Sequence, residues 1–449
     1  MKQGVRGAGN KADLTADRPG WLFVLAIVAP LAGCGAGLVG ALFRLTLLAA
    51  DRVRVALVLS LHGWSVGGFV VVVALVAVAA AIAAWLVRRF APPASGSGIP
   101  QVEATLSEEM EPAPPSLLGV KFVGGALAIG SGLALGREGP SIQMGAVILY
   151  EAGRLLRRSG AQCRVLLAAG AGAGLATAFN APLSGAVFVL EELLKRFDAR
   201  AGIAALAASA TAIWIERWIL GNAPDFMVGH LAHPSFREEP LFVLFGAAAG
   251  LAGVVYNRLL ITGLETADRL HTLPVELRAA IVGAGVGIVA WFGPSLVGGG
   301  DPLTQQALNG VGTLAVLPLM YLLRQGLITC SYAAGTPGGL FAPLLVLGAE
   351  LGLWFGKLWA LAVPDLGIQP QGFALVGMAA LFTAIVRAPL TGIVLVTEMT
   401  ANVTMLLPMI VACSAAMLVP TLLDNPPIYD SLKERLFRER VHIAVAKEE

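Results

Sequence analysis

The sequence is poor in charge. Asp, Glu, Lys and Arg supply 13% of its 449 residues, about half the share found in a typical soluble domain. Hydrophobic residues supply 57%, and the mean hydropathy is +0.77. Such a chain cannot hide its apolar surface in water, whereas a bilayer accepts it if each segment satisfies its own backbone as a helix. The composition therefore excludes an ordinary soluble domain and predicts an all-α polytopic membrane protein.

Cysteine and histidine are scarce and scattered. The four cysteines stand singly in apolar segments, without the close pairs that zinc sites and disulfide frameworks require. The five histidines fall in expected loops or in the tail, and none is paired at ligand spacing within a span. We therefore expect no metal site and no cofactor, and we interpret the cysteines as core or lipid-facing thiols.

Long basic runs are also missing. The formal net charge is only +2, and the basic clusters flank apolar stretches as topology signals do, so nothing suggests nucleic-acid binding. A basic leader at residues 1–20 precedes an apolar stretch at 21–50, which is too long for a signal-peptide core of roughly 7–15 residues. Together with the basic residues of the tail, Lys433, Arg435, Arg438 and Arg440, the leader predicts that both termini are cytoplasmic and that the number of membrane crossings is even.

Glycine and proline, by contrast, are abundant inside apolar sequence, with 54 and 26 copies. They divide the chain into many apolar blocks, several of them shorter than the ~20 residues that a membrane span needs. Short, interrupted segments are typical of broken or re-entrant helices, which are tolerated only where the backbone lines a cavity or is buried in protein. This pattern favours a transporter or a channel.

The two halves of the chain repeat each other. Three landmarks recur in the same order about 200 residues apart, which is hard to attribute to chance even in a chain rich in glycine and proline. The offsets do not tell whether the repeats run parallel or inverted. In transporters, repeats of this kind place the substrate at their interface near the bilayer midplane. The matched segments are 96–100 with 298–302, 136–140 with 339–343, and 181–191 with 388–398.

Each landmark has the composition of a helix start, with small residues for a tight turn and proline near the first helical position. The free N–H groups and the helix dipole then favour an anion without a full positive charge, so the ion can bind and also leave. Ser97 would add a hydroxyl donor, or would simply cap a helix. Leu340 and Phe341 would offer backbone amides, or would lie in an ordinary loop-to-helix junction.

Glu138 lies between Ala-Leu-Gly-Arg and Gly-Pro, with about 20 mostly apolar or small residues on each side, so its charge is costly unless it is paired or neutralised. One interpretation is an ion pair with the adjacent Arg137 at the membrane surface. The other is a carboxylate that occupies the anion site, competes with the ion, and takes up a proton when displaced. One group would then couple two fluxes.

Three further residues keep two interpretations each. Glu191 and Glu192 end an apolar run ahead of Lys195, which is typical of a solvated cytoplasmic helix end; if one of them is buried, it would relay protons between Glu138 and the cytoplasm. Tyr429 follows the last apolar block. It is either an interfacial tyrosine or a phenol donor that turns back to the anion.

Over residues 21–436 the chain resembles the CLC family of chloride channels and transporters. The segments 96–100, 136–140 and 339–343 are similar to the three anion-filter signatures of that family in order and spacing, although the third reads Gly-Leu-Phe rather than the commoner Gly-Ile-Phe. The resemblance implies a CLC-type inverted-topology repeat with many tilted and broken helices. It also implies a homodimer in which each subunit has its own pore.

The same resemblance implies ligands for chloride. Ser97 and Tyr429 resemble the inner chloride ligands of the family, and the amides of Leu340 and Phe341 resemble its backbone ligands. Family members selective for nitrate carry proline where this chain has Ser97, so serine favours chloride.

Two glutamates and one ion pair complete the implied site. Glu138 resembles the external gating glutamate, and Glu192 resembles the internal proton glutamate that channels of the family usually lack. Glu103 and Lys121 match a buried acid-base pair that we interpret as structural. The acid at Glu192 favours coupled exchange over passive conduction.

The implied function is a secondary active chloride/proton antiporter of the inner membrane, with a passive voltage- or pH-gated chloride channel as the alternative. We expect a first membrane repeat at 21–220, a second at 221–436, and a short tail at 437–449. No nucleotide-binding domain follows, so ATP is not expected as a partner; chloride, protons and membrane lipid are. An enzyme is disfavoured because the spans offer no nucleophile or metal cluster.

Overall fold

The computed structural model describes residues 19–270 and 272–448, and it describes side chains from residue 25 to residue 438 apart from residue 271. Most of the expected leader at 1–20 lies outside these residues, whereas the backbone of the expected tail at 437–449 is described as far as residue 448. The described chain is built of α-helices with a few short 3-10 or π turns, and in this part of the chain the only extended pairing is two isolated backbone bridges. The all-α fold predicted from composition is confirmed.

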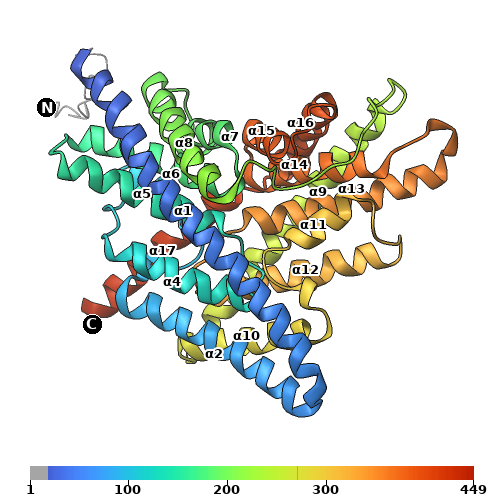
Figure 1. Ribbon diagram of the computed structural model, residues 1–449, viewed down its shortest axis with the longest axis horizontal. Helices are drawn as coiled ribbons and strands as arrows, with labels where there is room; N and C mark the ends of the chain where they lie inside the picture. The colour runs from blue at the N-terminus through green and yellow to red at the C-terminus, as the bar shows by residue number, and fades with distance from the viewer. Residues whose placement is uncertain (1–18, 271, 449) are drawn as a thin grey trace, which may run out of the picture.

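The described part of the first half forms eight α-helices, drawn from blue to green in Figure 1. Their bounds are α1 Pro19–Leu61, α2 Val66–Phe90, α3 Ile99–Leu106, α4 Ser116–Ser131, α5 Glu138–Leu155, α6 Gly160–Phe179, α7 Pro182–Phe188 and α8 Ala199–Leu220.

The described part of the second half forms eight helices, of which the first is again the longest and the third and seventh are again the shortest, followed by one more. Their bounds are α9 Glu239–Arg269, α10 Val275–Phe292, α11 Asp301–Leu308, α12 Val316–Ala333, α13 Phe341–Ala362, α14 Pro370–Val386, α15 Pro389–Thr400, α16 Leu406–Leu422 and α17 Ile428–Glu448. Short turns are η1 His62–Trp64, η2 Pro92–Ala94, η3 Val189–Leu193, η4 Pro294–Leu296 and η5 Pro364–Leu366, of which η3 is a π-helix.

The two repeats are inverted, and α7 and α15 demonstrate it. Glu191, in η3 directly after α7, accepts hydrogen bonds from the Leu390 and Thr391 amides at the start of α15, at 3.0 and 2.7 Å. Glu398, near the end of α15, accepts in return from the first-turn amides of α7, at 3.0 and 2.8 Å. Each helix therefore ends beside the start of its counterpart. Carboxylates at helix N-termini are stabilised by free N–H groups and the helix dipole.

Close helix crossings recur in both repeats. A Cβ atom built on Gly145 of α5 would lie 2.3 Å from the carbonyl oxygen of Gly170 in α6, and one built on Gly348 of α13 would lie 2.3 Å from that of Gly377 in α14. Only glycine lets these backbones approach so closely. The crossings fix α5 and α13, whose first residues belong to two of the predicted anion motifs.

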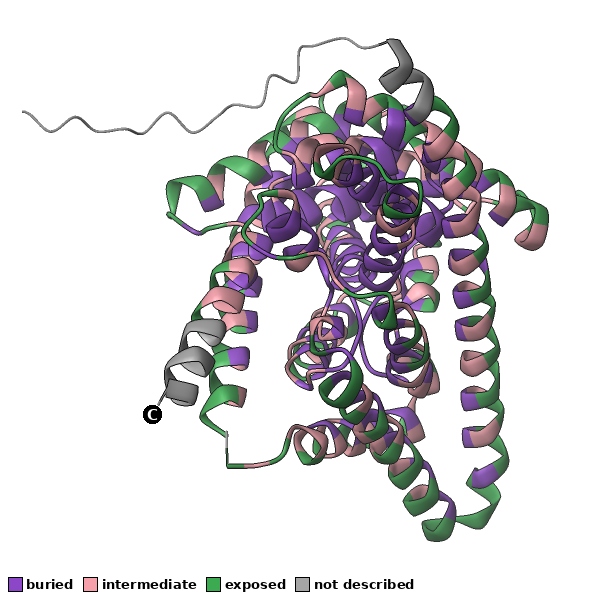
Figure 2. Ribbon diagram, turned by 90° about the vertical axis from the view of Figure 1, so that its left-hand side faces the viewer, coloured by how far each residue is buried: buried purple, intermediate pink, exposed green. Residues whose placement is uncertain are grey.

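Among the described helices, seven are long and apolar enough to cross a membrane, judged by length and composition, and four more are apolar but shorter. Figure 2 shows buried residues gathered in the middle of the molecule and exposed ones at its periphery. Many outer apolar side chains are exposed, including Trp214 and Trp218 of α8. This distribution suits a lipid environment, where apolar surface needs no cover from protein.

Candidate anion and proton site

Three of the predicted motifs meet in the core through backbone hydrogen bonds. The Gly96 amide donates to the Thr336 carbonyl at 3.1 Å, and the Gly338 amide donates to the Gly96 carbonyl at 3.1 Å. Gly136 and Gly339 exchange amide-to-carbonyl bonds at 2.8 and 2.7 Å. The loops that precede α3, α5 and α13 are thus held side by side, although about 240 residues separate the first from the last.

The carboxylate of Glu138 lies between two of these helix starts. Glu138 is the first residue of α5 and is fully buried. A Cβ atom on Gly136 would lie 2.1 Å from one of its oxygens, and a Cβ on Gly339 would lie 2.4 Å from the other. The Phe341 and Ala342 amides face the carboxylate, yet neither oxygen has a partner at hydrogen-bond geometry within the described chain. The side chain of an acidic residue therefore already occupies the space in front of the α13 N-terminus.

The other predicted ligands surround the same space. Leu340 is the N-cap residue and Phe341 the first residue of α13, and both are fully buried. The Tyr429 ring stacks on Phe341 with centroids 6.0 Å apart, and its buried hydroxyl has no partner in the described structure. Ser97 is also buried and accepts a hydrogen bond from the Ile99 amide at 3.1 Å. The Ser97 hydroxyl thus accepts from the first amide of α3, and like any hydroxyl it also has one hydrogen to donate. Tyr429 is not an interfacial tyrosine.

Sequence reasoning missed two tyrosines beside this site. The Tyr332 hydroxyl, from α12, accepts from the Ser97 amide at 3.4 Å. Tyr256, from α9, is fully buried, has no hydroxyl partner among the described residues, and is close enough to Glu138 for their charges to interact. Both lie inside ordinary apolar helices, so neither spacing nor a neighbouring motif distinguished them from core aromatics.

The predicted ion pair between Glu103 and Lys121 is not formed, and this expectation was wrong. The Lys121 ammonium, on α4, donates instead to the carbonyls of Ala94 and Gly96 at 3.0 and 2.8 Å. It thereby pins the loop that carries Ser97. A long lysine stem can reach loop carbonyls in place of an acid, which spacing alone does not reveal.

Arg324 on α12 is the counterpart of Lys121 in the second repeat. Its guanidinium is fully buried and donates to the carbonyls of Leu296, Gly298 and Gly299 at 3.1, 3.0 and 3.2 Å. Both repeats therefore use one buried cation to fix the loop ahead of a short helix, α3 or α11.

Glu103 belongs to an ion cluster at the end of α7. Its carboxylate pairs with Lys195 at 3.0 Å and lies 3.7 Å from the Lys433 ammonium, and Lys195 also pairs with Asp430. Burial opposes the charge on Lys195, but the hydrogen bond to Asp430 and the charge of Glu103 outweigh it and raise the pKa of the ammonium above its ordinary value. Lys195 therefore stays charged across the physiological pH range.

Glu192 lies beside this cluster, within the π-helix η3. Its side chain is buried, and one carboxylate oxygen has no partner in the part of the chain that the structure describes. Its neighbour Glu191 is committed to capping α15. Of the two acids, only Glu192 is therefore both buried and available. A π-bulge often marks a functional position because it redirects a side chain out of the regular helix.

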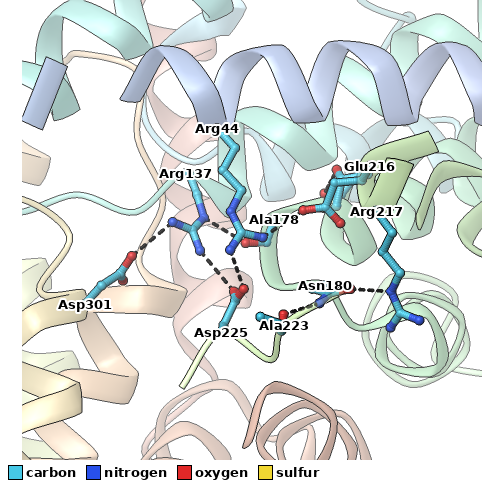
Figure 3. A network of polar contacts seen from close by, with 11 residues as sticks. Arg44, Arg137, Ala178, Asn180, Glu216, Arg217, Ala223, Asp225 and Asp301 are labelled. Carbon is cyan, nitrogen blue, oxygen red and sulfur yellow. Dashed lines mark hydrogen bonds and ion pairs between the residues drawn. The ribbon is translucent and has the colours of Figure 1, made fainter. Parts of the chain in front are cut away.

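The ion pair between Arg137 and Glu138, considered above as an alternative, is not formed either. Arg137 donates to Asp301 at 3.0 Å, to Asp225 at 3.1 Å and to the Ala178 carbonyl at 2.7 Å (Figure 3). Glu138 is left unpaired.

The fold and this geometry define a class of protein. Inverted repeats of apolar helices enclose a space bounded by helix N-termini, hydroxyl groups and one unpaired carboxylate, which is the arrangement of a membrane transport protein for anions. No group of three His, Cys, Asp or Glu side chains within the described ranges is placed to hold a metal ion.

Comparison with known proteins identifies the family. Residues 79–421 match the family described as "Voltage gated chloride channel", and the chain belongs to this family. It is 37% identical over 422 residues to the H(+)/Cl(-) exchange transporter ClcA of Vibrio parahaemolyticus, covering 93% of this chain and 90% of that one. A ClcA from Citrobacter koseri is 35% identical over 418 residues, covering 91% and 88%.

A solved structure is also similar. A slow cyanobacterial Cl-/H+ antiporter has a TM-score of 0.87 and 34% identity, covering 92% of this chain and 97% of that one. The shared fold is the CLC-type inverted repeat that the sequence predicted.

Proposed function

We propose that this protein is a secondary active antiporter that exchanges chloride for protons. The observation that carries the proposal is the Glu138 carboxylate, which is buried and without a hydrogen-bond partner in the described structure while it faces the N-terminus of α13. An anion at that position competes directly with the carboxylate. The names of the relatives, exchange transporters and a Cl-/H+ antiporter, support exchange over passive conduction.

In the proposed cycle, the Glu138 carboxylate and a chloride ion occupy the same position at the α13 N-terminus in turn. Chloride displaces the Glu138 carboxylate from the α13 N-terminus, and the displaced carboxylate takes up a proton because its charge no longer has the amides of that helix to stabilise it. Protonated, it leaves the anion free to move on. Glu192 exchanges the proton with the cytoplasm through the end of α7.

The proposed chloride ligands lie at or next to the starts of α3, α13 and α17. The Ser97 hydroxyl and the Tyr429 hydroxyl each have a hydrogen to donate, and the Leu340 and Phe341 amides add the partial positive charge of α13. Such groups hold chloride without a full countercharge in the path. Glu103 and Lys121 support the site without joining it, the first through Lys195 and the second through the Ser97 loop.

We place the protein in the inner membrane as a multi-pass homodimer with one pore in each subunit and both termini in the cytoplasm. The membrane repeats lie at 21–220 and 221–436. Seven apolar helices of spanning length support the multi-pass placement. The orientation rests on the basic residues near the two ends of the chain.

The substitution Glu138→Gln tests the coupling. The amide keeps the size of the side chain but cannot carry the charge that competes with chloride or the proton that replaces it. In liposomes loaded with chloride, we expect chloride efflux to continue and proton movement to vanish. Continued chloride-driven proton transport in this variant would contradict the role of Glu138. A wild type that moves chloride with no protons would support the channel alternative.

A further inference from the structure

A buried ion network holds Arg137, the residue that immediately precedes Glu138. Figure 3 shows its guanidinium between Asp225 and Asp301, with Arg44 alongside. All three nitrogen groups of Arg137 donate: Nη2 to Asp225, Nη1 to Asp301 and Nε to the Ala178 carbonyl. The partners come from α6, the α8–α9 loop and α11, so both repeats contribute.

The anchors of the network differ in burial. The Asp225 side chain is only 3% exposed and also pairs with Arg44 of α1, which in turn donates to Glu216 of α8 at 2.7 Å. Asp301, at the first position of α11, is 45% exposed and has Arg137 as its ion-pair partner. Asp225 is therefore the firmer of the two holds on Arg137.

Without Glu138, the network already holds more carboxylates than guanidinium groups. Two guanidinium groups face three carboxylates, those of Glu216, Asp225 and Asp301. After Asp301 and Asp225, the carboxylate that interacts most strongly with Arg137 is the one on Glu138. A buried guanidinium that loses a partner must find another acceptor, because an unpaired buried charge is costly. Glu138, the next residue, offers a buried carboxylate whose two oxygens have no hydrogen-bond partner in the described structure.

We propose that Asp225 and Asp301 are positioning residues that hold the Arg137 guanidinium away from the Glu138 carboxylate and so leave this carboxylate free to exchange with chloride and protons. The proposal rests on the exchange function proposed above. It assigns the network a role in coupling, beyond fastening α1 to the ends of α5, α8 and α11. An ion pair between Arg137 and Glu138 would keep the carboxylate charged and out of the anion position.

The test is Asp225→Asn in reconstituted liposomes, with chloride and proton fluxes recorded together. The neutral amide cannot balance the guanidinium, and we expect the proton-to-chloride ratio to fall about tenfold, the size that loss of a hydrogen bond to a charged group produces. The conservative Asp225→Glu, which retains the charge, should recover most of the wild-type ratio. A folded Asp225→Asn protein with the wild-type ratio would overturn the proposal.

The double variant Glu138→Gln with Asp225→Asn distinguishes a positioning role of Asp225 from a purely structural one. In Glu138→Gln no carboxylate is available for Arg137 to capture, so adding Asp225→Asn should leave chloride turnover unchanged. A further fall in chloride turnover in that double variant would mean that the network acts only on the fold, and it would overturn the proposal.

If Asp225→Asn does not fold, Asp301→Asn replaces it, since that side chain is half exposed and has one guanidinium partner. The expected fall in the ratio is smaller, about twofold, because Asp225 still holds Arg137. An unchanged ratio in folded Asp301→Asn would then overturn the proposal.

Wild-type protein from the same preparation distinguishes failure of the exchange function from failure of this inference. A wild type without coupling rejects the exchange function and this inference with it. A coupled wild type with an unaffected variant rejects this inference alone.

Discussion

Glu191 and Glu192 are neighbours in the sequence, but their carboxylates have different surroundings. Glu191 accepts two amide hydrogen bonds and the Thr391 hydroxyl at 2.8 Å, so both of its oxygens are committed to α15. Glu192 is buried with one oxygen free of any partner among the described residues. The π-turn of η3 turns the two side chains to different neighbours. A proton relay needs an available carboxylate, which only Glu192 provides.

Glu191 provides a matched control for the proposed role of Glu192. Glu192→Gln cannot carry a proton to the cytoplasm, so we expect proton transport to be lost while chloride transport continues. Glu191→Gln keeps the relay but weakens the cap on α15, which should lower stability by about 1 kcal/mol with coupling retained. Flux in liposomes and thermal unfolding in detergent measure the two effects. The relay assignment fails if the two variants exchange these phenotypes.

Prediction from sequence was strongest for residues inside motifs and weakest for long charged side chains. The three helix starts were found because glycine and proline mark them, and the structure brings these starts together in the core. Lys121 was paired with the wrong partner because its flexible stem reaches carbonyls that spacing does not reveal. The network around Arg137 was not foreseen, since Asp225 lies in a loop without any motif.

At the scale of elements, glycine sets the distance between helices that carry the site. Gly348 holds α13 against α14, with the Gly377 carbonyl oxygen only 2.3 Å from where a Cβ would stand. The amides proposed to bind chloride are at the start of the same helix. Any displacement of α13 therefore moves these amides.

We predict that Gly348→Ala destabilises the protein by about 1–3 kcal/mol, the usual cost of overpacking a tight interior. The control is Gly326→Ala in α12, where a Cβ meets no atom within 4 Å and alanine is the better helix former. The midpoint temperature of thermal unfolding in detergent should therefore fall for Gly348→Ala and stay the same or rise for Gly326→Ala. Equal stability of both variants would refute the close crossing.

The repeat was visible in the sequence at the level of elements, but its orientation was not. Matching motifs give order and offset, whereas direction depends on which ends of α7 and α15 meet in space. The reciprocal caps by Glu191 and Glu398 settle that question in the structure. Lengths of individual helices were also beyond sequence reasoning, because apolar runs continue through several breaks without a change in composition.

At the scale of the whole molecule, exposed apolar surface needs a covering of lipid or protein. Trp214 and Trp218 of α8 and Leu407 of α16 lie on the outside of the helices. The homodimer that we propose would cover part of this surface, and membrane lipid would cover the rest.

The dimer has a direct physical test. Light scattering of purified protein in detergent, corrected for the bound detergent, should give twice the 46.3 kDa mass of one chain. Coupling should be the same in both subunits, because each contains a complete set of site residues. A mass of one chain in protein that transports normally would contradict the dimer.

The central claim is that the flux of one ion drives the other through Glu138. The most direct measurement imposes a chloride gradient across liposomes that contain the wild-type protein, with no initial pH difference, and records proton and chloride movement together. We predict that chloride leaving the liposomes drives protons inward and creates a pH gradient, which Glu138→Gln fails to create. Chloride movement without any proton movement in the wild type would contradict the account.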